Sequence, residues 1–166
     1  MQSGRVVILG MLLLGVAAAA TGLWVHYRQG RRSLEYWGVE SALFIRDADK
    51  VELLELTATK DPSQAEHVQL GKSAWTIAAC QDVTHAPGIL HVRQLLLDDN
   101  SIDWEGPVPS CIHEHLHGLR FVQGDRQLTV VFDLECQVVR LPQSRPLSMV
   151  PVAAFLKRWI GEQTRL

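Results

Sequence analysis

The stretch LRFVQGDRQLTVVFDLECQV, residues 119–138, decides the fold of this chain. Apolar and polar residues alternate on both sides of Gly124-Asp125, a pair typical of a tight turn between antiparallel strands. With the turn centred there, Leu119 faces Val130 and one face of the pair is apolar. That face also carries Phe121, Leu128, Phe132, Leu134, Cys136 and Val138, and the other carries Thr129, Asp133, Glu135 and Gln137. The stretch therefore predicts a β-hairpin with one face in the core.

An amphipathic helix is expected after the hairpin. Ser148 suits an N-cap, and Pro151 falls in the first turn, where its missing N–H costs nothing. Apolar residues then recur at helical spacing, and Gly161 is expected to end the helix. The apolar stripe consists of Val152, Phe155, Leu156, Trp159 and Ile160.

Further elements are expected before the hairpin. A helix is predicted over 84–98, with Pro87 in its first turn, and another over 33–49. Strands are predicted over 51–59, 67–70 and 75–83, the last two around Gly71-Lys72. Helices interleaved with antiparallel hairpins predict an α+β domain, with an antiparallel sheet of four or five strands and helices on one face.

The segment VVILGMLLLGVAAAATGLWV, residues 6–25, carries no charge. As a helix it would span about 30 Å, the thickness of a bilayer's hydrocarbon core. Trp24 and Tyr27 suit the membrane interface, and a collar of Arg28, Arg31 and Arg32 suits lipid headgroups. The segment predicts a single N-terminal transmembrane helix.

A cleaved signal peptide is the alternative for this segment. Arg5 supplies a basic start, and Ala18 to Ala20 could serve as the small-residue cleavage site. The apolar run continues past that site to Val25, which favours a retained helix.

Small residues gather on one side of the expected transmembrane helix. They occur at i, i+3, i+4 and i+7, which places them on one helix face. The four are Gly15, Ala18, Ala19 and Gly22. Close approach of another helix would explain such a face, although an Ala-rich segment also produces it by chance. We expect other membrane protein subunits to contact this face.

The expected organisation is a lead over 1–5, the transmembrane helix over 6–25, the collar and a juxtamembrane helix over 26–50, and a soluble α+β domain over 51–166. The arginine collar alone favours a cytoplasmic domain. A single apolar segment with a short lead favours a signal anchor, and therefore a cell-membrane protein with an extracytoplasmic, periplasmic domain.

The net charge of the chain after the arginine collar argues against nucleic acid as a partner. The chain has 16 basic and 18 acidic residues, but from Ser33 onward 12 basic residues face 18 acidic ones, a net charge of −6. A domain so acidic lacks the positive surface that nucleic acids require.

Three cysteines are present, Cys80, Cys111 and Cys136, without CxxC spacing. The hairpin register places Cys136 opposite His113, two residues from Cys111 on the same strand face, where diagonal neighbours approach disulfide distance. We therefore predict a Cys111–Cys136 bridge and an oxidising compartment. Cys80 lies in an apolar strand and is expected to be a buried free thiol.

Alternate histidines precede the hairpin in CIHEHLHG. If the strand extends backward, His113, His115 and His117 share one face and could bind a transition metal. The alternative is a solvated strand entry, with a bulge at Gly118 that separates the imidazoles. Apart from this possible metal, no cofactor is expected.

No catalytic motif accompanies these features. GxSxG, HExxH, P-loop and GxGxxG patterns are absent, and the carboxylates between Asp98 and Glu105 lack calcium-loop spacing. The leading hypothesis is a non-catalytic accessory or scaffold subunit of a membrane protein complex. The alternatives are a metal-handling protein that uses the three histidines, and a sensor or assembly factor that binds a protein or peptide.

Overall fold

The computed structural model describes residues 3–28, 31–58, 66–71, 73–109, 111 and 113–164. Within the first helix, it describes the side chains of residue 8 and residues 10–24.

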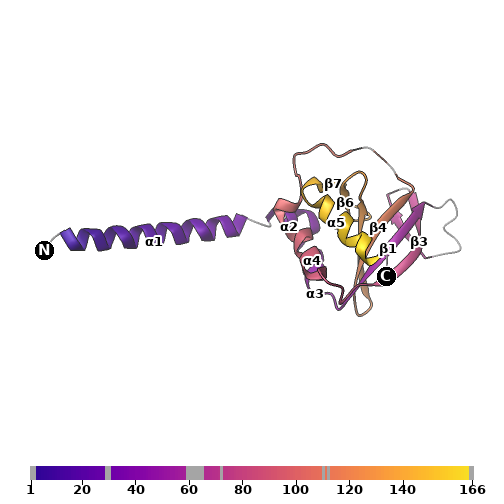
Figure 1. Cartoon of the computed structure of the whole chain (residues 1–166), viewed down its shortest axis with the longest axis horizontal. Coiled ribbons are helices and arrows are strands. Elements are labelled where there is room, and N and C mark those ends of the chain that lie inside the picture. Colours follow the sequence, from indigo (N-terminus) through magenta and orange to yellow (C-terminus); the bar gives the residue numbers. More distant parts are fainter. Residues whose placement is uncertain are drawn as a thin grey trace.

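The described residues fold into an α+β structure with five α-helices and one curled antiparallel sheet (Figure 1). The helices are α1 (Ser3–Arg28), α2 (Arg31–Trp37), α3 (Val39–Asp47), α4 (Ile89–Leu97) and α5 (Val150–Gln163), with a 3-10 turn η1 (Asp99–Ser101) after α4. The strands are β1 (Lys50–Ala58), β2 (His67–Leu70), β3 (Ser73–Asp82), β4 (His115–Gln123), β5 (Arg126–Asp133), β6 (Val138–Arg140) and β7 (Leu147–Ser148). Their order in the sheet is β2-β3-β1-β4-β5-β6-β7.

The predicted hairpin is present as β4 and β5 in the expected register. Leu119 pairs with Val130 and Phe121 pairs with Leu128, around a turn where Gly124 has a φ of 58°. All four apolar side chains lie in the core or pack against it. Alternation and turn chemistry therefore fixed this register, as local patterns do in antiparallel pairs.

The sheet has seven strands, which corrects the prediction of four or five. The predicted strand through Val138 stops at Asp133, because a turn follows in which Gln137 adopts a φ of 56°. The chain then resumes pairing as β6, followed by the two-residue β7. Strands this short lack the periodicity from which sequence patterns are read.

Helix α4 begins at Ile89, later than expected. Gly88 precedes it with a φ of 85°, a left-handed conformation that interrupts helical geometry. Trp159 of α5 donates its indole N–H to Pro87 O at 2.7 Å, which holds this turn against α5.

The sheet is apolar on both faces. Helices α2 to α5 cover one face, and its core includes Leu53, Leu119 and Phe132. A second cluster occupies the other face, here called the second face, and comprises Leu54, Leu56, Val68, Leu70, Trp75, Leu116 and Val131. Strand β1 supplies residues to both clusters, which explains why its sequence alternates imperfectly.

The curl of the sheet shelters the second face. Gly71, in the turn between β2 and β3, donates its backbone N–H to Pro142 O at 3.2 Å. This bond joins one end of the sheet to the loop that follows β6. A hollow is thereby enclosed between strands that are distant in the sheet order.

Helix α1 projects away from the other elements (Figure 1). No helix among the described residues combines the length and the apolarity needed to cross a membrane. This finding contradicts the predicted transmembrane helix over 6–25. We therefore withdraw it, together with the single-pass, cell-membrane and periplasmic assignments that depended on it.

The arginine collar forms ion pairs with acidic side chains. Arg31 pairs with Glu35 at 3.3 Å, and Arg32 pairs with Glu105 at 3.6 Å, while the side chain of Arg28 lies outside the described residues. The small-residue face of α1 is uncovered: Gly15, Ala18, Ala19 and Gly22 are exposed, and an added Cβ at either glycine would meet nothing within 4 Å.

Candidate functional site

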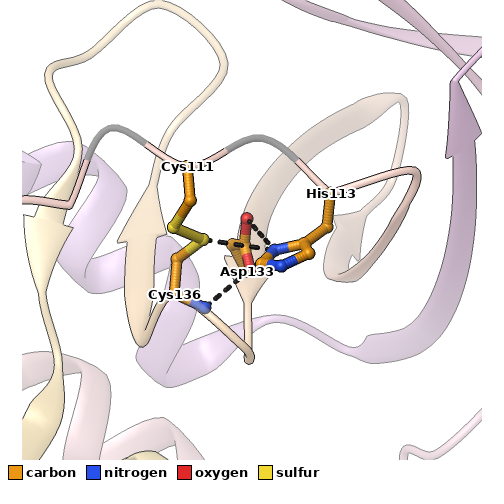
Figure 2. The surroundings of a disulfide bond; sticks show 4 residues. All are labelled: Cys111, His113, Asp133 and Cys136. Carbon is orange, nitrogen blue, oxygen red and sulfur yellow. Dashed lines mark hydrogen bonds and ion pairs between the residues drawn. A yellow bond between two sulfur atoms is a disulfide. The ribbon is translucent and has the colours of Figure 1, made fainter.

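A disulfide joins Cys111 and Cys136, the pair predicted from the sequence, with the Cα atoms 6.3 Å apart (Figure 2). Cys111 lies exposed in the segment that leads to β4, and Cys136 lies buried in the turn between β5 and β6. Because such bridges persist in oxidising surroundings, the disulfide favours an oxidising compartment.

His113 and Asp133 lie against this disulfide (Figure 2). The Nδ1 atom of His113 is 3.0 Å from Asp133 Oδ1 and 3.3 Å from Oδ2. The same Nδ1 atom is 3.2 Å from the sulfur of Cys136. These four residues, Cys111, His113, Asp133 and Cys136, are here called the disulfide cluster.

Local backbone structure positions the carboxylate of the cluster. Asp133 is the last residue of β5, and its Oδ1 accepts the backbone N–H of Cys136 at 2.9 Å. Aspartate side chains often accept a backbone N–H from a residue that follows in the same turn, and this hydrogen bond stabilises the turn. Asp133 therefore holds the turn that presents Cys136 and also faces the imidazole of His113.

The three predicted histidines do not form one site. Only His113 belongs to the disulfide cluster, which is the one group of three or more close metal-ligand side chains among the described residues. His115 and His117 lie within β4, where His117 pairs with Glu55 of β1. His113 precedes β4, so the alternation of the strand does not extend to it. Burial lowers the pKa of His117, against a smaller opposing effect of Glu55.

A cavity of about 150 Å³ opens beside the cluster on the second face. Its walls come from β2, β3, β4, β5 and β6, from Cys136 in the turn between β5 and β6, and from Pro109, Cys111, His113 and Pro146. The lining residues are Leu70, Ser73, Trp75, Pro109, Cys111, His113, Leu116, Val131, Asp133, Cys136, Val138, Arg140 and Pro146. All four members of the disulfide cluster are therefore part of the cavity wall.

Two side chains of the cavity wall carry donors for which the described residues supply no ion-pair or hydrogen-bond partner at the atoms named below. Trp75 is 3% exposed, and its buried Nε1 has no acceptor within the described part of the chain. Arg140 is half-buried, and none of the ion pairs between described residues involves its guanidinium. Because buried donors are normally satisfied, the Nε1 atom of Trp75 indicates that the cavity can take an acceptor, and the guanidinium of Arg140 lies in the same wall.

A charged network lies elsewhere on the second face. Arg120 Nε donates to Glu52 Oε2 at 2.6 Å, and its other nitrogens reach Glu66 and the sulfur of Cys80, the latter at 3.7 Å. Burial acts to raise the pKa of Glu52, but hydrogen bonds from Lys50 and Arg120 outweigh it, and the pKa falls below its usual value.

Cys80 is free and exposed, not buried as expected from its apolar strand. Partial desolvation nevertheless raises the pKa of its thiol, and the Glu52 carboxylate acts in the same direction. A thiol with a raised pKa forms little thiolate at neutral pH, so Cys80 is a poor nucleophile.

An open hollow lies on the helix side, between α2 and the loops around residues 104 and 145. Tyr36 contributes to its wall and donates its hydroxyl hydrogen to Arg145 O at 2.6 Å. Burial raises the pKa of Tyr36 to about 12. Trp104 donates its indole N–H to Asp99 O at 2.9 Å. The polar groups of these two aromatic side chains thus already have partners.

Sequence reasoning missed Asp133, Trp75 and Arg140 as site residues. Asp133 did appear among the polar residues of the hairpin, on the face opposite the core. Trp75 and Arg140 lie 65 positions apart in the sequence, and only the curl of the sheet brings them to one cavity. No local pattern could have indicated that pairing.

Comparison of the chain with protein-family models, curated proteins and solved structures found no match.

Proposed function

We propose that this chain is a non-catalytic accessory subunit that binds a segment of a partner protein in the cavity beside the disulfide. The observation that carries this proposal is the buried Trp75 Nε1, which has no acceptor among the described residues, in the wall of a cavity that also contains the Arg140 guanidinium and apolar side chains such as Leu116 and Val131.

The size of the cavity limits what can enter it. A cavity of about 150 Å³ is the size of one that holds a benzene-sized group. One apolar side chain of a partner therefore fits against Leu116 and Val131. A larger organic ligand would have to leave most of its surface outside.

The donors of Trp75 and Arg140 define the chemistry of the occupant. A buried donor without an acceptor costs roughly 1–3 kcal/mol, which an occupant with a suitably placed acceptor recovers. Arginine binds carboxylates with particular preference because its N–H groups match both oxygens. The proposed occupant is therefore a segment in which a large apolar side chain lies beside a carboxylate, from Asp, Glu or a chain terminus.

The arrangement of His113 supports binding over catalysis. Its Nδ1 faces Asp133, the arrangement in which a histidine acts as a base in hydrolases. Such a base also needs a hydroxyl or thiol nucleophile at Nε2, and none of the hydrogen bonds between described residues joins one to that atom. The neighbouring sulfurs are bonded to each other.

Helix α1 supplies a second surface for partner subunits in this proposal. Its described side chains are exposed along the helix, and large apolar ones include Met11, Leu14 and Leu23 at 70%, 73% and 71% exposure. Contiguous apolar surface of this kind is normally covered by another protein. The partner that occupies the cavity, or another subunit of the same complex, would cover α1.

A peptide-display selection tests the proposal. The oxidised full chain serves as bait for a random peptide library, and the same selection is run with the Arg140→Gln variant. Arg158→Gln is the matched control, because Arg158 is exposed on α5, on the helix side of the sheet. Peptides that pair a large apolar residue with a carboxylate should be enriched with the wild type and the control but lost with Arg140→Gln. Equal enrichment with all three baits would contradict the proposal.

A further inference from the structure

We propose that reduction of the Cys111–Cys136 disulfide converts the disulfide cluster into a Zn²⁺ site with Cys111, His113, Asp133 and Cys136 as its four ligands. The inference is independent of peptide binding, because it depends only on the four side chains and their chemistry.

The distances within the cluster suit a four-coordinate metal. The four ligand atoms all lie within 4.8 Å of one another. Zinc bonds of about 2.0–2.3 Å in tetrahedral geometry require ligand atoms about 3.3–3.8 Å apart. The separations of 3.0 to 3.3 Å between His113 Nδ1 and both Asp133 oxygens, and of 3.2 Å from that atom to the Cys136 sulfur, are within a few tenths of an ångström of this requirement. The two sulfurs, now bonded together, must separate, and no pair of ligand atoms in the cluster is more than 4.8 Å apart.

The backbone allows that separation. The Cα atoms of the two cysteines are 6.3 Å apart. At that distance rotation about the side-chain torsions can move the sulfurs apart without moving the strands. Cys111 is exposed, so its side chain has room to turn.

The ligand set is one that zinc prefers. Two thiolates, one imidazole and one carboxylate are all established zinc ligands, and four protein ligands make a closed, structural type of site. The carboxylate is already held by the backbone N–H of Cys136, which is the kind of outer hydrogen bond that orients metal ligands. His113 is 41% exposed at its side chain, so an ion can reach the cluster from solvent.

The disulfide cluster becomes a zinc site in two steps, a thiol–disulfide exchange and then metal binding. A dithiol supplies two electrons and two protons: its own sulfurs form a disulfide, the Cys111–Cys136 bond breaks, and two thiols result. Binding of Zn²⁺ then displaces one proton from each thiol, so two protons leave for one ion bound. In the oxidised state neither sulfur can become a thiolate. The disulfide and the zinc site therefore exclude each other.

The test measures metal retention by the full chain in both redox states. Oxidised protein and protein reduced with a phosphine are each loaded with Zn²⁺ alone, desalted without oxygen and analysed for metal. In this reduction the phosphine takes up oxygen from water to give the phosphine oxide. We expect close to one Zn²⁺ per reduced chain and less than a tenth of that on the oxidised chain. Co²⁺ bound to the reduced chain should show a sulfur-to-cobalt charge-transfer band.

Variants locate the site. His113→Gln and Asp133→Asn should each weaken Zn²⁺ binding at least tenfold, whereas Cys80→Ser and His115→Gln, which change a cysteine and a histidine outside the cluster, should not. Circular dichroism and a thermal melt accompany each sample, and Zn²⁺ should raise the melting temperature of the reduced wild type. The inference is overturned if the reduced chain retains no Zn²⁺, if the oxidised chain retains as much, if His113→Gln binds like the wild type, or if the reduced chain stays unfolded when Zn²⁺ is present.

Discussion

Arg120 of β4 donates from Nε to Glu52 of β1 at 2.6 Å, and both side chains are nearly buried, at 12% and 11% exposure. The same guanidinium reaches Glu66, next to β2, and the sulfur of Cys80 in β3. One arginine therefore connects side chains from four neighbouring parts of the curled sheet. The network joins β4 to β1 and β3 on the same face of the sheet as the cavity.

Replacement of Arg120 by Met should destabilise the fold strongly, because it leaves the Glu52 carboxylate buried without its partner. Loss of one member of a buried pair typically costs about 3–5 kcal/mol, and Lys50, which also contacts Glu52, should reduce that to about 2–3 kcal/mol here. Urea unfolding measures the change. The double variant Glu52→Gln with Arg120→Met should recover much of the loss, and a double variant as unstable as the single one would argue against an electrostatic origin.

The histidine inside β4 predicts a loss of stability in mild acid. Burial lowers the pKa of His117 below its ordinary value of 6.5. As the pH falls below about 6.5, the unfolded chain binds a proton at this histidine before the folded chain does, so the free energy of unfolding decreases until the lowered pKa is passed. His117→Gln should flatten this dependence below pH 6.5, measured by urea unfolding at each pH. An unchanged pH profile would mean that other groups dominate.

Replacement of glycine by alanine is expected to have opposite effects on stability at Gly88 and at Gly161. At Gly88, alanine would face a left-handed φ of 85° and a contact of 3.2 Å with Trp159 Nε1, so we expect a loss of about 1–2 kcal/mol. Gly161 lies inside α5, where an added Cβ meets nothing within 4 Å, and alanine should stabilise the helix by up to about 1 kcal/mol. Thermal melts of both variants check the pair. A Gly88→Ala protein as stable as the wild type would contradict the role given to this turn.

The cysteine arrangement predicts a simple labelling result. Protein unfolded without reductant should react with a thiol reagent at one cysteine, Cys80, and at three cysteines after reduction. Mass spectrometry counts the labels and locates them by digestion. Three labels before reduction would show that the bridge is absent.

Local signals in the sequence predicted the local parts of this fold well. Gly124 and the alternation around it fixed the β4–β5 register, and the apolar spacing from Val152 to Ile160 predicted α5. Gly161 did not end α5, which continues to Gln163, because a glycine that keeps helical geometry only weakens a helix.

Non-local features could not be predicted in the same way. Strand β1 pairs with both β3 and β4, and the hydrogen bond from Gly71 to Pro142 closes the second face. Neither contact can be recognised from a repeating pattern of residues in the sequence. The cavity depends on both. The expected alignment of three histidines required a strand that reaches back to residue 113, but β4 begins at His115, so His113 lies outside the strand.

The most direct test of the central claim is the affinity of a display-selected peptide for two variants of the cavity wall. Trp75→Phe keeps a smaller aromatic ring but removes the unpartnered N–H, and Arg140→Gln removes the positive charge from the cavity wall. Calorimetric titration of the oxidised full chain should show each variant binding the peptide roughly tenfold more weakly than the wild type, as expected for the loss of about 1.4 kcal/mol in a buried or charge-assisted hydrogen bond. Unchanged affinity in both variants, with their melting temperatures also unchanged, would contradict the account.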